Sequence, residues 1–374
     1  MPAPASPAAL DQARMQRALQ VAEQAIGLSD PNPRVGCVLA GDGWTAEGHT
    51  QAAGQAHAEV MALRAARAAG HDPRGATAYV TLEPCAHHGR TPPCCDALVE
   101  AGIARVVVAL ADPNPLVGGR GIERLRAAGI AVELGLGEAQ ARELNIGFLH
   151  RMTRGLPFVR LKVAASLDGR TALADGRSQW ITGVAARTDG HAWRRRAGAV
   201  LTGIGTVLAD DPRLDVRELP TARQPLRVVL DARLQIAPNA RIVQPPGELL
   251  VYTAQADCAA ADTLRECGAQ VAAAPLQGTR IDLAAVLRDL AARGVNELHV
   301  EAGARLNASF VEHDLVDEWL AYLAPMLVGP GRAIADLPGL ADLADARRWQ
   351  FVDALLLGGD VRLRARRLAA PPQA

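Results

Sequence analysis

Residues 83–94 read EPCAHHGRTPPC, and the triplet His57-Ala58-Glu59 precedes them in the chain. A strand predicted over residues 76–82 ends just before Pro84-Cys85, and Pro92-Pro93 favours the start of a helix that Cys94 opens. One imidazole and two thiolates make a zinc site with three protein ligands, which leaves the fourth position for water. Zinc lowers the pKa of such a water to about 7. This stretch therefore predicts a catalytic metal site between a strand and a helix.

The carboxylate of Glu59 stands two residues after the histidine of this motif. At that offset it can lie beside the metal without binding it, take a proton from water and return the proton to a leaving amine. A His-x-Glu triplet followed by Pro-Cys is typical of zinc deaminases that act on nucleobases.

Other interpretations of these residues stay open at this point. The three ligands could form a structural zinc site or a buried cluster, and Cys95 could replace its neighbour, although one step along a helix turns the side chain away. His87 and His88 are more typical of loop or substrate contacts than of ligands. Arg90 is a candidate contact for a phosphorylated substrate or else a solvated loop charge. Asn32, between two prolines, is a candidate substrate contact or only a turn former.

The composition is that of a globular protein. The chain has 374 residues, which suggests two domains, and its 40 Lys+Arg balance 40 Asp+Glu, which argues against a protein that coats nucleic acids. No run of about 18 apolar residues is present, so no membrane span is expected. Residues 1–10 lack the pattern of a secretory signal, so we expect the cytoplasm, where thiols stay reduced. Three cysteines outside the motif are expected to carry no chemistry: Cys37, Cys258 and Cys267.

Strand and helix patterns alternate along the first 150 residues, which predicts an α/β fold with helices on both sides of a sheet. A single helical pattern over residues 138–151 closes this region, and Gly155-Leu156-Pro157 marks a boundary. We therefore expect one domain at residues 8–152 and a second at residues 155–370.

Residues 83–94, together with further stretches in both halves of the chain, resemble the bifunctional deaminase/reductase family of riboflavin biosynthesis. In the first half the resemblance rests on residues 83–94, Pro31-Asn32-Pro33 with Val35-Gly36, and Asp112-Pro113-Asn114-Pro115. It implies a cytidine-deaminase-like three-layer domain, then a dihydrofolate-reductase-like domain, with zinc and NADPH as cofactors. In the second half it rests on residues 162–170, 178–183, 205–212, 300–303 and 317–318.

The resemblance also implies a role for single residues. It implies that His57, Cys85 and Cys94 bind zinc and that Glu59 is the catalytic proton shuttle. Contacts with the substrate are implied for Ser178, Arg194, Leu214, Arg217 and Glu301. Contacts with NADPH are implied for Ala164, Trp180, Thr206, Asp210, Gly303, Ala304, Arg305, Leu306, Asn307, Ala308 and Ser309.

Elementary chemistry supports some of these roles and leaves others open. Arg194 and Arg217 suit a fork-shaped clamp on a phosphate, but the arginine run 194–196 is also typical of a solvated helix face. Trp180 could simply belong to the core. Ala232 stands where relatives often place a hydroxyl residue, which weakens any side-chain contact with the cofactor there. We find no obvious proton donor for the reduction.

The family implies two consecutive reactions on one chain. The first removes the 2-amino group of 2,5-diamino-6-(5-phosphoribosylamino)pyrimidin-4-one by hydrolysis, and the second reduces the ribosyl side chain to ribityl with NADPH. The expected partner is this small molecule, with no nucleic acid and no membrane, and a homo-oligomer is expected. The alternatives are a zinc deaminase acting on another nucleotide or on RNA bases, which would leave the second half idle, and a zinc-stabilised scaffold without catalysis.

Overall fold

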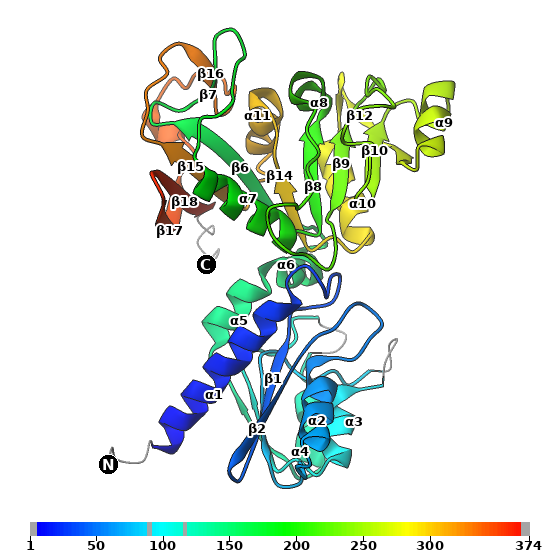
Figure 1. Ribbon diagram of the computed structural model, residues 1–374, viewed down its shortest axis with the longest axis vertical. Helices are drawn as coiled ribbons and strands as arrows, with labels where there is room; N and C mark the ends of the chain where they lie inside the picture. Colours follow the sequence, from blue (N-terminus) through cyan, green and yellow to red (C-terminus); the bar gives the residue numbers. More distant parts are fainter. Residues whose placement is uncertain (1–5, 88–91, 115–117, 368–374) are drawn as a thin grey trace. The chain divides into compact units, whose positions relative to one another are not determined.

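The structure is a computed structural model that describes residues 6–87, 92–114 and 118–367. The chain divides into two units, residues 1–155 and 156–374. Figure 1 shows a sheet with helices in each of them. Within the described ranges, no helix has both the length and the apolar character needed to cross a membrane.

The first unit is built on a five-stranded sheet in the order β2-β1-β3-β4-β5. β1 runs antiparallel to both of its neighbours, whereas β3, β4 and β5 are parallel. In Figure 1, α1 and α5 lie on one side of this sheet and α2, α3 and α4 on the other. The elements are α1 (Pro7–Ala22), η1 (Glu23–Ala25), β1 (Gly36–Gly41), β2 (Trp44–His49), α2 (Ala58–Ala68), β3 (Thr77–Val80), α3 (Cys94–Glu100), β4 (Arg105–Val108), α4 (Arg120–Ala127), β5 (Ala131–Leu134), α5 (Glu138–Leu144) and α6 (Ile146–Arg154).

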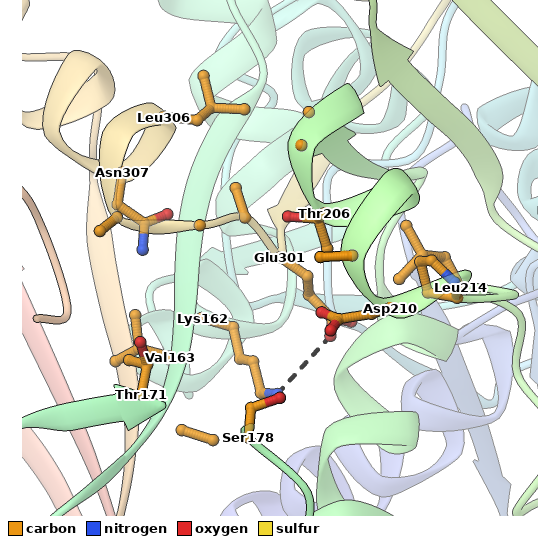
Figure 2. A pocket seen from close by; sticks show the side chains of 18 of the residues that line it. Lys162, Val163, Thr171, Ser178, Thr206, Asp210, Leu214, Glu301, Leu306 and Asn307 are labelled. Atoms are coloured by element: carbon orange, nitrogen blue, oxygen red, sulfur yellow. Dashed lines mark ion pairs between the residues drawn. The ribbon is translucent and has the colours of Figure 1, made fainter. Parts of the chain in front are cut away.

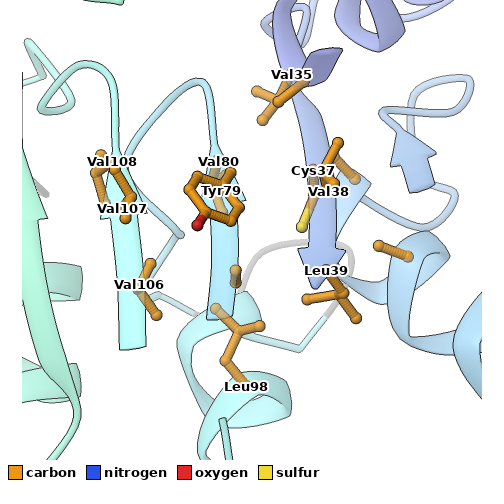
Figure 3. Packing of buried hydrophobic residues seen from close by; sticks show 14 of the residues in the cluster. Val35, Cys37, Val38, Leu39, Tyr79, Val80, Leu98, Val106, Val107 and Val108 are labelled. Carbon is orange, nitrogen blue, oxygen red and sulfur yellow. The ribbon is translucent and has the colours of Figure 1, made fainter. Parts of the chain in front are cut away.

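The core of this unit lies between the sheet and its helices. Figure 3 shows Leu39, Tyr79 and Val107 on neighbouring strands and Leu98 on α3, all members of one buried cluster. Cys37 is fully buried in this cluster, as expected of a core thiol.

Two local features differ from the sequence-based expectations. β2 was not predicted; it forms a hairpin with β1 around Asp42-Gly43, and Gly43 has a φ of +73°. The prediction of one helix over residues 138–151 is wrong, because the helix is interrupted at Asn145. The Asn145 side chain accepts from the backbone N–H of Arg34 at 2.7 Å and donates to the Arg34 carbonyl at 2.9 Å. This bond to a distant segment holds Asn145 between α5 and α6.

The second unit contains a nine-stranded sheet in the order β11-β10-β9-β8-β14-β6-β15-β18-β17. The strands from β11 to β15 are parallel, and β18 and β17 are added antiparallel. The strands are β6 (Phe158–Ser166), β7 (Arg170–Leu173), β8 (Ala199–Gly203), β9 (Leu226–Leu230), β10 (Leu249–Thr253), β11 (Gln270–Ala273), β12 (Leu276–Gln277), β13 (Arg280–Ile281), β14 (Glu297–Val300), β15 (Glu318–Ala324), β16 (Gly331–Ala333), β17 (Trp349–Leu357) and β18 (Asp360–Arg367). The helices are α7 (Val184–Arg196), α8 (Ile204–Asp210), α9 (Ala259–Glu266), α10 (Leu283–Ala292), α11 (Ala304–Glu312) and η2 (Leu343–Asp345).

Buried charges lie at the amino ends of the central strands of this sheet. Arg160 of β6 donates from Nη1 to Glu297 Oε2 at 2.8 Å and from Nε to Glu318 Oε1 at 2.6 Å. Glu297 and Glu318 open β14 and β15. Glu297 also pairs with Arg196, and Glu318 pairs with Arg364 and Arg366, so these buried charges form a network in which each has more than one partner. These ion pairs fix the amino ends, whereas a ligand site is expected at the carboxyl ends of parallel strands.

Candidate active sites

The first candidate site joins three residues from separate elements of the first unit. His57 is the N-cap residue of α2, Cys85 lies in the loop after β3, and Cys94 is the first residue of α3. Their ligand atoms all lie within 4.8 Å of one another. The structure therefore brings together the three residues that the sequence motif singled out.

The distances within this cluster fit a tetrahedral zinc ion. His57 Nδ1 lies 3.6 Å from Cys85 Sγ and 3.3 Å from Cys94 Sγ. Ligands about 2.0–2.3 Å from one tetrahedral ion lie about 3.5 Å apart, which is the spacing observed. Nδ1 faces both sulfurs and is therefore the histidine atom placed to bind a metal. Nitrogen and sulfur donors in this number also match the chemistry of zinc.

Glu59 lies in the first turn of α2 and is only 3% exposed. Burial raises the pKa of its carboxyl to about 7, and the nearby Cys85 sulfur adds to that shift. The Cys85 thiol is affected in the opposite direction: a hydrogen bond from the Cys94 thiol lowers its pKa to about 4, and His57 contributes to the same effect. The Glu59 carboxyl thus has a pKa near neutrality and lies beside the Cys85 thiolate. Such a carboxyl can both accept and donate a proton near pH 7.

The structure separates the open alternatives around this site. Cys95 is fully buried in the hydrophobic core, 3.8 Å from Asp96 Oδ1, so it does not replace Cys94 in the cluster. Asn32 lies in the turn before β1, where its carbonyl accepts from the Ser29 hydroxyl. Among the described contacts, none links the Asn32 side chain to the cluster. Two predicted loop residues, His88 and Arg90, lie outside the described residues.

Glu83 anchors the cysteine loop, and the sequence analysis missed it. Its carboxylate accepts four backbone N–H groups: from Asp112 and Gly119 at 3.0 Å, from Gly121 at 2.9 Å and from Ile122 at 3.3 Å. A Cβ on Gly121 would lie 2.0 Å from the Pro84 carbonyl oxygen, so α4 packs directly against the loop. The carboxylate thus fixes the residues just before Cys85. Its position two residues before the cysteine was the available signal.

The second candidate site is a pocket of about 1510 Å³ in the second unit. It lies at the carboxyl ends of β8, β9 and β14, and Figure 2 shows Thr206, Asp210, Glu301 and Asn307 around it. Most of the residues predicted to contact NADPH or substrate in this half line the pocket. Ala308 is the exception, because it is buried in α11 and does not line the pocket. The residues that do line it are Ala164, Ser178, Trp180, Arg194, Thr206, Asp210, Leu214, Arg217, Glu301, Gly303, Ala304, Arg305, Leu306, Asn307 and Ser309.

Trp180 is 67% exposed at the mouth of this pocket, with the Arg187 guanidinium 4.5 Å from its ring centroid. The interpretation of Trp180 as a core residue is therefore wrong. An exposed, cation-stacked ring in a pocket is suited to pack against a flat ligand.

Arg194 is already paired within the protein. Its Nε and Nη2 both donate to the Glu301 carboxylate, with Nη2–Oε2 at 3.0 Å, and its Nη1 donates to the Asp215 carbonyl at 3.0 Å. Of the five N–H donors of a guanidinium, two have no partner among the described contacts and can serve a ligand. Burial alone would raise the pKa of Glu301, but the charges of Arg194 and Lys162 hold it well below its usual range. The Arg217 side chain is 45% exposed, and among the described contacts its guanidinium is bonded through Nη1 to Asp215, so Arg217 is the more open cation.

Lys162 is a pocket residue that the sequence analysis did not assign. Its ammonium lies 3.6 Å from Glu301 Oε2, an ion pair drawn as a dashed line in Figure 2. The signal was present in the composition, because Lys162 is the only lysine among the 40 Lys and Arg residues of the chain. A chain that uses arginine at every other basic position and keeps one lysine in a pocket points to a need for the ammonium there.

Comparisons with known proteins agree with this division of the chain. The family model of the cytidine and deoxycytidylate deaminase zinc-binding region matches residues 8–110, and that of the RibD C-terminal domain matches residues 157–363. The riboflavin biosynthesis protein RibD of Escherichia coli strain K12 is 46% identical over 368 residues, which cover 94% of this chain and 98% of that protein. A structure of Acinetobacter baumannii RibD superposes with a TM-score of 0.87 at 44% identity, over 96% of this chain and 99% of that one. A Thermotoga maritima diaminohydroxyphosphoribosylaminopyrimidine deaminase/5-amino-6-(5-phosphoribosylamino)uracil reductase gives 0.87 at 34% identity, over 96% and 99%.

Proposed function

Because this chain belongs to the RibD family of riboflavin biosynthesis proteins, we propose that the two sites described above carry out its two reactions. The chain is a bifunctional enzyme with a zinc-binding deaminase domain and a reductase domain that uses NADPH. The cytidine-deaminase-like and dihydrofolate-reductase-like folds expected from the sequence are confirmed, and the alternative of an RNA-base deaminase is not favoured.

We propose 2,5-diamino-6-(5-phosphoribosylamino)pyrimidin-4-one as the first substrate. The name of the Thermotoga maritima relative gives the same substrate class. The pocket of the second unit supports the proposal, because the cation Arg217 lines it and can bind a phosphate. We further propose that the enzyme works in the cytoplasm, where the thiols of Cys85 and Cys94 stay reduced.

In the deaminase site, we propose that His57, Cys85 and Cys94 hold the zinc ion. Zinc with three protein ligands supplies a nucleophile from water at neutral pH. Glu59 takes up the proton released from that water and delivers it to the amino group that leaves as ammonia. Its raised pKa suits both halves of this transfer, because the carboxyl exchanges a proton readily near pH 7. Glu83 holds Cys85 in place through bonds to the backbone N–H groups of Asp112 and Gly121.

In the reductase site, we propose that the segment 303–309, without Ala308, binds NADPH together with Ala164, Trp180, Thr206 and Asp210; NADPH supplies the hydride when bound. α11 begins after its N-cap residue Gly303, and its first residues line the pocket; the N-terminus of a helix suits a pyrophosphate. Glu301, Ser178, Arg194, Leu214 and Arg217 contact the phosphoribosyl substrate. Asn32 and Arg90 stay predictions for the deaminase substrate.

The observation that carries this assignment is the His57–Cys85–Cys94 cluster with a buried Glu59 beside it. We expect purified protein, given the diaminopyrimidine nucleotide and NADPH, to release ammonia and then consume NADPH, read by an ammonia assay and by absorbance. Prior removal of metal by a chelator abolishes the ammonia, and zinc restores it. With the deaminated nucleotide as substrate, NADPH consumption survives the chelator. Ammonia release that persists without metal would contradict the assignment, as would deamination of transfer RNA in place of the nucleotide.

We also propose that copies of this chain associate through β17. β17 is the last strand of its sheet, and its Phe351 and Leu356 are 68% and 74% exposed. Apolar side chains on an edge strand form a surface that a second strand can cover. Light scattering is expected to give at least twice the mass of one chain, and Leu356→Arg to give the mass of one chain. A monomeric native protein at micromolar concentration would rule this association out.

A further inference from the structure

The segment 213–217 belongs to no helix or strand, and its residues Arg213, Leu214 and Arg217 line the reductase pocket. Side chains hold it in place. The Asp215 carbonyl accepts from Arg194, and the Asp215 carboxylate, which is buried, pairs with Arg213 at 3.0 Å and with Arg217 at 2.8 Å. The Asp215 carboxylate thereby orients the guanidinium groups of Arg213 and Arg217.

The backbone of the same segment is bonded to two side chains from outside it. The Gln224 amide accepts the N–H of Val216 and donates to its carbonyl, both at 2.8 Å. The next residue, Arg217, donates its backbone N–H to His191 Nδ1 at 3.4 Å. His191 comes from α7, a different element, and is only 5% exposed. Arg217 is thus held at its side chain by Asp215 and at its backbone by His191.

The surroundings keep this histidine neutral. Burial lowers the pKa of His191 to about 4, and the positive charges of Arg194 and Arg217 add to this effect against the opposing charges of Glu301 and Glu218. A neutral imidazole has one nitrogen without a proton. Because Nδ1 faces an N–H donor, the proton lies on Nε2, which is 4.0 Å from Glu218 Oε1. The ring can therefore serve as a permanent acceptor for the backbone of Arg217.

We propose that His191 is a positioning residue of the reductase, which fixes the Arg217 backbone so that the Arg217 side chain meets the phosphate of the substrate. This inference rests on the proposed contact between Arg217 and that phosphate. A cation that is already oriented binds without the cost of ordering a long side chain, so the loss of His191 weakens phosphate binding specifically. Binding of NADPH, which we place on the α11 side, does not depend on it.

Two substitutions distinguish the roles of the two ring nitrogens of His191. In His191→Asn, the Asn oxygen takes the place of Nδ1 and can accept the Arg217 N–H. In His191→Gln, the amide nitrogen takes the place of Nε2, and the N–H of Arg217 loses its acceptor. Calorimetry with ribose 5-phosphate as the probe gives Kd for these variants, for His191→Ala and for Arg217→Ala. For the same variants, we would measure KM and kcat of the reductase, NADPH binding by fluorescence, and thermal stability.

We expect His191→Ala and His191→Gln to raise the Kd of ribose 5-phosphate and the substrate KM about 5- to 10-fold, the effect of one hydrogen bond. His191→Asn stays within about twofold of the native protein. Ammonia release and NADPH binding are unchanged in all three variants, which shows that they are folded. If the alanine variant does not fold, the Asn and Gln variants still decide the question.

Two results would overturn the positioning role: native affinity in both His191→Ala and His191→Gln, or native affinity in His191→Gln with weak binding in His191→Asn. The second result would mean that Nε2 contacts the phosphate directly. Arg217→Ala keeps this inference apart from the proposed function. If Arg217→Ala binds ribose 5-phosphate normally, the phosphate contact itself is wrong, whereas weak binding in Arg217→Ala with native binding in the His191 variants refutes only the role of His191.

Discussion

Glu59→Gln is expected to lower the rate of ammonia release by about 10²- to 10⁴-fold, the contribution of a positioned acid–base group. An amide has nearly the same shape as the carboxyl, so the substitution fits the buried position of Glu59 in α2. It cannot accept a proton, however, and so cannot pass one to the leaving amine. Zinc content, measured by atomic absorption on the purified variant, is expected to stay at one ion per chain.

Glu123→Gln is a matched control for this experiment. Glu123 also lies in the first turn of a helix, α4, but it is exposed. We expect the control to deaminate at the native rate. The deaminated nucleotide should be reduced with NADPH at the native rate by both variants, which reports on folding of the second unit. Native ammonia release by Glu59→Gln would refute the proton shuttle, and loss of zinc from that variant would show a structural role instead.

The deaminase cluster could be predicted from the sequence because each of its parts is local. His57 begins a helix, Cys85 follows a strand and Cys94 begins another helix, and each boundary has its own residue pattern. Ligand chemistry then requires the three to meet, since single thiolates and imidazoles bind zinc poorly alone. Glu59 follows from the helix geometry, because it lies in the first turn beside its histidine.

The contacts that the sequence could not predict join residues far apart in the chain. Asn145 interrupts a helical pattern only because Arg34 lies beside it in the fold. From the sequence alone, Arg194 is one of three consecutive arginines typical of an exposed helix face. In the structure, its Nε and Nη2 donate to Glu301, which is 107 residues away in the chain. The periodicity of apolar residues indicates which face of a helix or strand is buried. It does not indicate which polar group of another element a side chain on that face will contact. Pairings of this kind therefore needed the structure.

The hairpin of β1 and β2 could have been found from the sequence. Asp42-Gly43 is a strong turn signal, and glycine adopts the positive φ that this turn requires. The flanking residues 36–41 and 44–49 alternate less clearly, because one strand is buried on both faces while the other is half exposed. A period-2 pattern is lost when both faces of a strand are covered. Turn chemistry was the better guide here.

Lys162→Met is expected to lower kcat/KM of the reductase by about 10²- to 10³-fold. The Lys162 ammonium lies in the pocket beside Glu301, where it can donate to the substrate, and the loss of one preorganised donor has an effect of this size. Arg194 still neutralises Glu301 in this variant, so the buried carboxylate keeps a partner and the fold is retained. Ammonia release is unchanged. Lys162→Arg is the matched variant: it keeps the positive charge but replaces a compact ammonium by a planar group. We expect Lys162→Arg to be as stable as the native protein but to reduce the substrate no faster than Lys162→Met.

An independent measurement uses the fact that Lys162 is the only lysine of the chain. An amine-directed reagent can modify just two groups, the N-terminal amine and this ammonium, and peptide mass spectrometry distinguishes them. NADPH with ribose 5-phosphate is expected to protect Lys162 from modification and to preserve reduction, because the ammonium lies 3.6 Å from Glu301 inside the pocket. A native reduction rate in Lys162→Arg would limit its role to balancing the charge of Glu301. Full activity after stoichiometric acylation of Lys162, which removes the charge, would show that the reduction does not need the ammonium at all.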